Sequence, residues 1–446
     1  MEGRTAMVKV SVIGAGSGFG RRISCDIMAR MGKTHDVELA LCDIDAFKLN
    51  AVKEYLEKVK EKNGITRTKV TTTLDRKESL MNADFVLLSV SIGGPAYFGE
   101  PYESEVGIPE KYGITQPVAD TMGPGAIFRC MRTAPEMIRM VEDVNRYAPN
   151  SMILNLTNPM AMLTAIVMRY AKVPVVGLCH GVSYNCNIIA ERLGIPREEI
   201  DFICAGINHM TWFIQARHNG KDILPEIRDL ILNYKHVQTG KRRSPQDWAS
   251  RSKILREFGW FTTESDRHIV EYVPWFQNDD HKDLYEYSEF TKGTKEQRQS
   301  WYADTGVTLE QEESMELVVS HEAASGIIEA VTTGKTFVFS ANVMNDGYIT
   351  NLPRNCIVEV PCTVDGNGLH PHYVGEIPTQ CAALCQTNIN EQLLMIEACC
   401  EQDKQKAFMA MMLDPECCAK LNLTQMRQMF EEMWAREEEL GIPLLK

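Results

Sequence analysis

The sequence lacks long apolar runs and dense clusters of basic residues. No apolar stretch approaches the roughly 20 residues that a membrane-spanning helix needs, and the first residues are polar, with no signal-peptide core. No block is rich in lysine and arginine, and 60 acidic residues outnumber 47 basic ones, which gives a formal net charge of −13. We therefore expect a cytoplasmic protein without a membrane or a nucleic acid as its partner.

The sequence also lacks the paired CxxC motifs that indicate structural zinc, although it has 14 cysteines. Cys399 is adjacent to Cys400 and Cys417 to Cys418, a spacing that does not suit a disulfide framework. Reduced thiols in a cytosolic protein are the simpler interpretation. This leaves open whether any single cysteine takes part in chemistry.

What the sequence does contain is an alternation of β-branched apolar runs with helical patterns. Strands are predicted at residues 8–13, 37–42, 84–90, 152–154 and 173–178. This alternation is typical of a parallel sheet with crossover connections, in which ligands bind where the strands end. Residues 1–200 are therefore predicted to form a Rossmann-like, doubly wound α/β domain.

The pattern changes beyond about residue 200, where residues 219–310 are rich in charge, tryptophan and tyrosine. Helices are predicted near 222–234, 246–258 and 311–333, strands at 336–340 and 356–360, and mainly helices over 380–440. Residues 201–446 are therefore expected to form an α+β domain that binds substrate and metal. Its aromatic middle and helical tail predict a homodimer or homotetramer.

A glycine-rich turn follows the first predicted strand, and an acid follows the second. The residues are Gly14, Ala15, Gly16, Ser17, Gly18, Phe19 and Asp43. Glycines at such a turn let backbone N–H groups approach a pyrophosphate, and the acid can accept hydrogen bonds from the ribose of NAD. The fingerprint is imperfect, because Phe19 stands where the third glycine is expected. The alternatives are a purely structural turn, or a flavin or nucleotide-sugar site.

Polar residues that can bind a metal or a substrate follow several later apolar runs. They are Asp120, Asn155, Asn158, Cys179, His180 and His209. Each has a structural alternative as a turn residue, a helix cap, a buried thiol or a core histidine. Their combination after a nucleotide-binding half favours function, because a thiolate and an imidazole can share one divalent ion and leave positions open for substrate oxygens.

Taken together, the motifs resemble glycoside hydrolase family 4, the NAD- and divalent-metal-dependent glycosidases that depart from the two-carboxylate scheme. The matching segments are 14–17 (GAGS), 119–125 (ADTMGPG), 155–160 (NLTNPM), 177–180 (GLCH), 204–210 (CAGINHM), 263–276 (TESDRHIVEYVPWF) and 345–347 (NDG). The resemblance covers nearly the whole chain and is strongest to melibiase-type α-galactosidases. The expected architecture is like that of lactate and malate dehydrogenases.

The resemblance implies a redox-assisted elimination on a small α-glycoside. NAD⁺ takes hydride from C3 of the terminal sugar, a base removes the C2 proton, the C1–O bond breaks, water adds, and the C3 ketone is reduced again. Mn²⁺ bound to sugar oxygens acts as a Lewis acid. The resemblance implies that Cys179 and His209 bind Mn²⁺. It implies that Tyr272 is the C2 base, which Asp266 could replace or assist, and that His180 is the acid at the leaving group. Asp120, Asn155 and Asn158 are expected to contact the sugar or the nicotinamide ribose.

Three features of the sequence bear on which sugar the protein cleaves. Residues 89–94 lack the arginine of family members that act on phosphorylated sugars, so an unphosphorylated substrate is favoured. Gly181 stands where α-galactosidases typically have serine and phospho-α-glucosidases glutamate, which keeps an α-glucosidase, an α-glucuronidase or an α-galacturonidase open beside the preferred α-galactosidase. Arg267 could bind a uronic carboxylate, or pair with Glu264 or Glu271.

Two other classes of protein compete with a glycosidase. A 2-hydroxy-acid dehydrogenase of lactate or malate type would share the expected architecture, but it would give Cys179 and His209 no task. A non-catalytic NAD-binding sensor would leave the polar residues at the strand ends unexplained.

Overall fold

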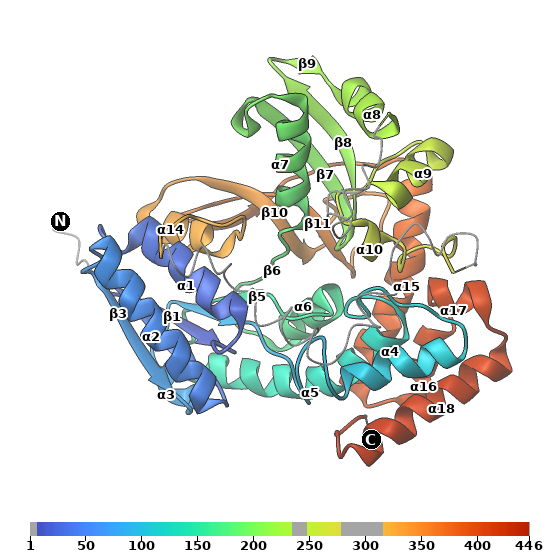
Figure 1. Cartoon of the computed structure of the whole chain (residues 1–446), viewed down its shortest axis with the longest axis horizontal. Helices are drawn as coiled ribbons and strands as arrows, with labels where there is room; N and C mark the ends of the chain where they lie inside the picture. The colour runs from blue at the N-terminus through green and yellow to red at the C-terminus, as the bar shows by residue number, and fades with distance from the viewer. Residues whose placement is uncertain (1–6, 234–247, 278–314, 446) are drawn as a thin grey trace.

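A computed structural model of the protein describes residues 7–233, 248–277 and 315–445 (Figure 1). Its centre is one twelve-stranded sheet in the order β3-β2-β1-β4-β5-β6-β10-β11-β7-β8-β9, with β12 paired to β11. The first strands in this order are parallel: β1 (Val8–Ile13), β2 (Val37–Cys42), β3 (Thr68–Thr73), β4 (Phe85–Leu88), β5 (Met152–Asn155) and β6 (Val175–Gly177). The predicted Rossmann-like parallel sheet is therefore confirmed, with β3 as a strand that the sequence analysis did not predict.

Beyond β6 the sheet continues with antiparallel strands. These are β10 (Phe337–Met344), β11 (Ile357–Asp365), β7 (Ile200–Ile207), β8 (Met210–His218), β9 (Lys221–Asp222) and β12 (Gly368–Pro371). Gly177 of β6 pairs with Asn342 of β10, Asn342 with Glu359 of β11, and Glu359 with Gly206 of β7. One row across the sheet thus joins the end of β6 to the end of β7. Because one sheet runs through both halves, the division at residue 200 stays a prediction.

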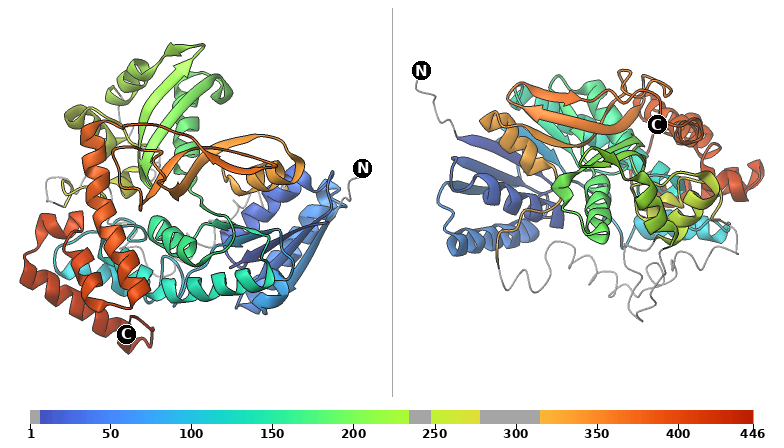
Figure 2. Two further views of the ribbon diagram at one scale, coloured as in Figure 1. Left: turned by 180° about the vertical axis from the view of Figure 1, so that it is seen from behind. Right: turned by 90° about the horizontal axis from the view of Figure 1, so that it is seen from above.

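Helices pack around the sheet, and the last four gather at the end far from β3 (Figures 1 and 2). The helices are α1 (Gly18–Met31), α2 (Ala46–Asn63), α3 (Arg76–Leu80), α4 (Tyr102–Lys111), α5 (Gly123–Tyr147), α6 (Met160–Tyr170), α7 (Gly181–Leu193), α8 (Leu224–Leu232), α9 (Ala249–Phe258), α10 (Asp266–Ile269), α14 (Ala324–Thr333), α15 (Thr379–Glu401), α16 (Lys404–Met411), α17 (Pro415–Lys420) and α18 (Leu423–Glu439), with a 3-10 turn at Arg197–Glu199. The long helix α5 is buried all round from Gly123 to Ala134, and it contacts α3, α4, α6 and α15. It therefore links the parallel half to the C-terminal helices.

The helices that follow β1 and β2 begin at side-chain caps. Ser17 Oγ accepts a hydrogen bond from Gly20 N over 3.2 Å at the start of α1. Asp45 caps α2 by accepting from the N–H groups of Phe47 and Lys48 over 3.0 and 3.1 Å. Each cap satisfies N–H groups that a helix leaves unpaired in its first turn. The loops at the ends of β1 and β2 are thereby fixed in position.

The predicted long helix over 311–333 is wrong for the first part that the structure describes. Residues 315–320 are irregular, and α14 begins only at Ala324. Ser320 donates its N–H and hydroxyl to the Asp26 carboxylate of α1 over 2.9 and 2.5 Å, so this segment is held by polar contacts to another helix. The helices predicted near 222–234, 246–258 and 380–440 are confirmed as α8, α9 and α15 to α18 within the described residues. Residues 234–247 and 278–314 of the predicted middle region lie outside them.

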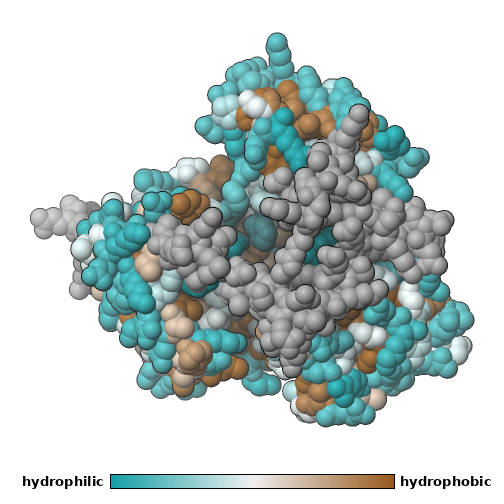
Figure 3. Space-filling model, in the orientation of Figure 1, coloured by the Kyte–Doolittle hydropathy of each residue, from teal (hydrophilic) through white to brown (hydrophobic). Residues whose placement is uncertain are grey.

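The outer surface is mostly hydrophilic where the structure describes it. In the space-filling view the described face is predominantly teal, with scattered apolar patches (Figure 3). Across residues 7–233, 248–277 and 315–445, none of the helices combines the length and the apolar character needed to cross a membrane.

Candidate active site

The glycine-rich turn joins β1 to α1 at the carboxyl end of the parallel strands. Gly14 has a φ of +84°, and a Cβ there would collide with the Ser89 carbonyl, so glycine is required. Gly16 N donates to Asp43 Oδ2 over 2.7 Å, and a Cβ on Gly16 would lie 2.9 Å from the same oxygen. The structure thus brings the turn and Asp43 together. Gly18 and Phe19 form the first turn of α1.

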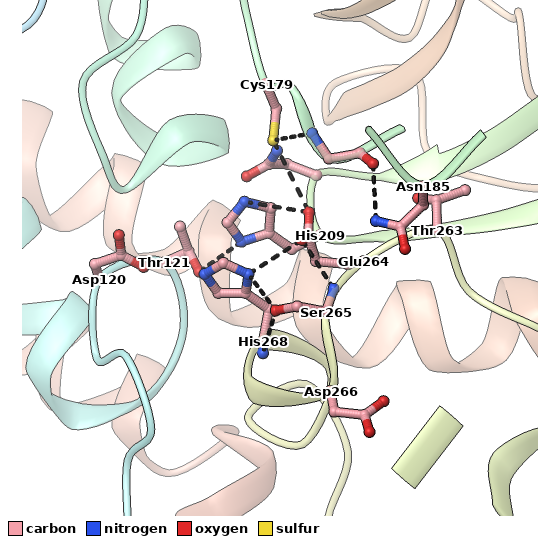
Figure 4. A network of polar contacts seen from close by, with 12 residues as sticks. Asp120, Thr121, Cys179, Asn185, His209, Thr263, Glu264, Ser265, Asp266 and His268 are labelled. Atoms are coloured by element: carbon pink, nitrogen blue, oxygen red, sulfur yellow. Dashed lines mark hydrogen bonds and ion pairs between the residues drawn. The ribbon is translucent and has the colours of Figure 1, made fainter. Parts of the chain in front are cut away.

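A thiol, an imidazole and a carboxylate converge beyond the ends of β6 and β7 (Figure 4). Cys179 Sγ, His209 and Glu264 each offer one ligand atom, and these three atoms lie within 4.8 Å of one another. Cys179 lies between β6 and α7, His209 in the turn between β7 and β8, and Glu264 just before α10. The turn that holds His209 is tight, because its φ is +60°, a conformation uncommon for residues other than glycine. Among the described residues this is the one such group that could hold a metal ion.

The Glu264 carboxylate is held so that one oxygen faces the other two ligand atoms. Oε1 accepts from Ser265 N over 2.9 Å and lies 3.2 Å from His268 Nδ1. Oε2 lies 3.7 Å from His209 Nε2 and 4.0 Å from Cys179 Sγ. The His268 ring stacks on the His209 ring with 4.0 Å between centroids. Glu264 was not among the metal ligands predicted from the sequence.

The electrostatics of the cluster suit a divalent cation. Burial and the neighbouring His268 lower the pKa of His209 to about 4, so the imidazole is neutral, and Thr121 Oγ1 lies 3.2 Å from Nδ1 on its other side. Burial disfavours an ionised Glu264, but its interactions with His209 and His268 and the hydrogen bond from Ser265 N hold the pKa of that carboxyl well below its usual value. Burial, and next the charge of Glu264, raise the pKa of the Cys179 thiol well above its usual value. A bound cation would reverse this effect on the thiol.

His180 lies beside Cys179 but faces a different partner. Its side chain is 47% exposed, and Nδ1 lies 3.3 Å from Glu322 Oε1. Partial burial disfavours the imidazolium, yet the hydrogen bond and charge of Glu322 raise the pKa of His180 above its usual value. Glu322 also lies 4.0 Å from Arg22 of α1, so it connects His180 with the helix of the glycine-rich turn. The sequence analysis missed Glu322.

Two of the predicted substrate residues are in direct contact. Asn158 Nδ2 donates to Asp120 Oδ2 over 2.8 Å, and Tyr97 OH donates to the same oxygen over 2.7 Å. Burial would raise the pKa of Asp120, but His268 and Arg129 outweigh it and lower that pKa below its usual value. Asp120 Oδ1 is buried and has no hydrogen-bond partner within the described ranges. A buried, ionised carboxylate oxygen is therefore available beside the metal cluster.

The third predicted substrate residue, Asn155, lies deeper in the fold. Its Nδ2 donates to Thr164 Oγ1 over 3.0 Å, and its Oδ1 accepts from Thr157 N over 3.0 Å. The residue is fully buried at the end of β5. Both ends of its amide are used to fix the loop that carries Asn158, so a contact to substrate is not supported by this placement.

Tyr272 is placed next to the cluster. It is 1% exposed, and its ring lies 6.2 Å from the His209 ring between centroids. Burial above all, with the carboxylates of Asp120 and Glu271, raises the pKa of Tyr272 well above its usual value, in spite of a hydrogen bond with Thr121. A phenolate would therefore need a positive charge nearby.

Asp266 and Arg267 both contact residues outside the metal cluster. Asp266 Oδ1 accepts from Arg251 Nε over 3.0 Å, and its carboxylate also accepts from the N–H groups of Ser250 and Arg251. In Figure 4 it points away from the metal cluster. Because its oxygens hold the start of α9, a role as the C2 base is not supported. Arg267 Nη2 donates to Pro117 O over 3.1 Å, beside the loop that carries Asp120.

Glu264 and Glu271, the two glutamates considered as partners of Arg267, each have other contacts. Glu264 is engaged by His209 and His268, as described above. Glu271 Oε1 accepts from Val118 N and Ala119 N over 2.6 and 2.9 Å. Burial raises the pKa of Glu271 to about 8, although these two bonds oppose the shift. Glu271 therefore shapes the loop before Asp120.

Known sequence families decide the class of this site. A sequence model of the family 4 glycosyl hydrolases matches residues 9–195, and one of the family 4 glycosyl hydrolase C-terminal domain matches residues 204–417. The chain belongs to glycosyl hydrolase family 4. It is therefore a glycoside hydrolase, and the alternatives of a 2-hydroxy-acid dehydrogenase and a non-catalytic sensor are wrong.

Curated relatives within family 4 differ in the sugar that their names give. The chain is 33% identical to an α-galactosidase of Bacillus subtilis (strain 168), covering 96% of this chain and 98% of that protein. It is 34% identical to an α-galactosidase of Rhizobium meliloti (strain 1021), covering 96% and 88%. It is 26% identical to an α-galacturonidase of Thermoanaerobacter italicus, covering 97% of each.

Solved structures support the fold. A 6-phospho-α-glucosidase from gut microorganisms, in complex with NAD and glucose-6-phosphate, matches with a TM-score of 0.81 and 21% identity over 99% of this chain and all of that one. A malate dehydrogenase of Plasmodium falciparum matches with a TM-score of 0.51 and 13% identity. The match covers 91% of this chain and all of the dehydrogenase. The expected dehydrogenase-like architecture is thereby confirmed.

Proposed function

We propose that this glycoside hydrolase cleaves unphosphorylated α-galactosides from their terminal end and requires NAD and Mn²⁺. The observation that carries the proposal is the convergence of Cys179, His209 and Glu264 at the sheet edge where the glycine-rich turn also ends. The α-galactoside is supported by the 33–34% identity to two α-galactosidases over most of the chain. The absence of an arginine in residues 89–94 supports an unphosphorylated sugar.

The residues present fit both cofactors. Residues 14–19 form the turn from β1 into the N-terminus of α1, where backbone N–H groups would bind a pyrophosphate, and Asp43 offers carboxylate oxygens to a ribose. The neutral imidazole of His209 and the ionised carboxylate of Glu264 are the forms that bind a metal. NAD⁺ supplies a hydride acceptor for C3 of the sugar, and Mn²⁺ supplies a Lewis acid for its oxygens.

The protein's own residues would then handle protons and orientation. Tyr272 is proposed as the base that takes the C2 proton, since it is the buried phenol beside His209. His180 would donate a proton to the leaving oxygen, because Glu322 favours its protonated form. Asp120 and Asn158 would orient sugar hydroxyls or the nicotinamide ribose through their shared hydrogen-bonded pair.

A panel of p-nitrophenyl α-glycosides tests the proposal. We expect release from the α-galactoside only when NAD⁺, Mn²⁺ and a reductant are all supplied. Activity that survives removal of NAD by charcoal and of metal by EDTA would contradict it. Faster release from an α-glucoside or an α-hexuronide would replace galactose by that sugar while keeping the chemistry. Deuterium placed at C2 should exchange with solvent during turnover, which direct displacement cannot produce.

A further inference from the structure

Gly181 follows Cys179 and His180, and its backbone conformation does not require a glycine. It is the first residue of α7, and its φ lies outside the left-handed range that favours glycine. A Cβ added there would collide with Glu264 Oε2 and lie 2.9 Å from Glu264 Cδ. The space that the missing side chain leaves is thus the space that the Glu264 carboxylate occupies.

Neither partner of this contact can move aside freely. Glu264 Oε1 is held by Ser265 N at 2.9 Å and by His268 Nδ1 at 3.2 Å. On the other side, Asn185 Nδ2 donates to Gly181 O over 3.0 Å, and Asn185 Oδ1 accepts from the buried Arg251 over 2.7 Å. A side chain at position 181 would therefore displace Oε2 from its place beside Cys179 and His209.

We propose that Gly181 and Glu264 are a matched pair that completes the metal site, with the missing side chain at 181 admitting the carboxylate as a third protein ligand of Mn²⁺. The inference rests on the proposed metal-dependent function and deepens it. Carboxylate oxygen suits Mn²⁺ better than thiolate sulfur does, so Glu264 supplies a ligand type that Cys179 and His209 lack.

The test measures Mn²⁺ binding directly, by the electron paramagnetic resonance signal of free Mn²⁺ titrated with the full chain in the presence of NAD and reductant. We expect Gly181→Ala and Glu264→Gln each to weaken Mn²⁺ binding by roughly 10- to 100-fold, the range for losing a partner that orients a metal site. Gly107→Ala is the matched control, because Gly107 lies in α4 and a Cβ there meets nothing within 4 Å. It should bind Mn²⁺ as the unchanged protein does.

A double-mutant cycle isolates the contact. If Gly181 acts through Glu264, Gly181→Ala should have no further effect in a Glu264→Ala background. Glu264→Asp, one methylene shorter, should restore part of the Mn²⁺ affinity in the Gly181→Ala background. NAD titration by protein fluorescence shows that each variant is folded.

The outcomes separate this inference from the proposed function. Unchanged Mn²⁺ affinity in folded Gly181→Ala and Glu264→Gln, with binding lost in Cys179→Ser, would overturn the inference and leave the metal-dependent function standing. Unchanged affinity in Cys179→Ser and His209→Ala as well would overturn both. Equal losses from Gly181→Ala with and without Glu264 would overturn the inference, because the glycine would then act independently of the carboxylate.

Discussion

The glycine-rich turn and the metal cluster lie at the same edge of one sheet, but they draw on the chain differently. The turn uses the contiguous residues 14–19 and one acid, Asp43, from the neighbouring strand β2. The cluster combines Cys179, His209 and Glu264, and the last of these lies 85 positions after the first. A phosphate-binding turn is therefore a local property of one strand and one helix, whereas this metal site forms only where several loops meet.

The loops meet because one continuous sheet changes from parallel to antiparallel strand pairing beyond β6. Parallel strands already place the loops after β1 and β6 at one edge. The antiparallel strands β10 and β11 then carry the row from Gly177 to Gly206, which brings the β7–β8 turn with His209 beside Cys179. Four predictions test whether the cofactor turn and the metal cluster act independently.

The largest effect is expected from Cys179→Ser. It should abolish Mn²⁺-dependent turnover because it replaces the thiolate ligand, while NAD binding stays intact because the turn is built elsewhere. Turnover and fluorescence titration with NAD measure the two properties on the same sample. Full activity would refute the ligand assignment, and loss of NAD binding in a folded variant would break the separation of the two regions.

Tyr272→Phe should lower kcat by roughly 10²- to 10⁴-fold, the usual contribution of a general base. Solvent exchange of C2 deuterium should fall with it, since both depend on the same proton transfer. Asp266→Asn is the comparison variant. It should lower the unfolding temperature because it removes the charge partner of buried Arg251, but leave kcat of the folded enzyme largely unchanged. The opposite ranking of the two kcat values would make Asp266 the base.

Asp43→Ala should raise the KM for NAD by roughly 10- to 100-fold, as expected for losing hydrogen bonds to a charged group. Mn²⁺ affinity should not change, because Asp43 contacts Gly16 and lies outside the metal cluster. Steady-state kinetics with varied NAD and a Mn²⁺ titration check the two statements. An equal loss of Mn²⁺ affinity would show that the two regions are not independent.

The smallest effect is expected from Glu322→Gln, which changes the residue that lies between His180 and Arg22 of α1. Glu322 raises the pKa of His180. The neutral glutamine should therefore lower the pKa of His180, so that His180 loses its proton at a lower pH. The alkaline limb of the pH profile of kcat should therefore shift to lower pH. Glu329→Gln, where the carboxylate pairs with Arg30 and Lys335 instead, should leave the limb in place. An alkaline limb that Glu322→Gln does not move would remove His180 as the acid.

Some of the site was predictable because the signal is local. The turn at 14–19 with Asp43, and the strand ends carrying Cys179 and His209, follow from apolar runs that end in polar residues. Glu264 and Glu322 carry no such signal, since neither directly follows a strand. Asp266 has the right residue type near the right motif, yet its contact with Arg251 could not be read from spacing.

The parallel half, the cofactor turn, the family and the absence of a long apolar run could all be read from the sequence, because strand periodicity and glycine geometry act over a few neighbouring residues. Only the tertiary structure decided which carboxylate joins Cys179 and His209, and that Gly181 leaves it room. The physical reason is that a metal site depends on distances between atoms of a few ångströms. Those distances are set by the packing of β6, β7 and the loop before α10, which are far apart in the chain.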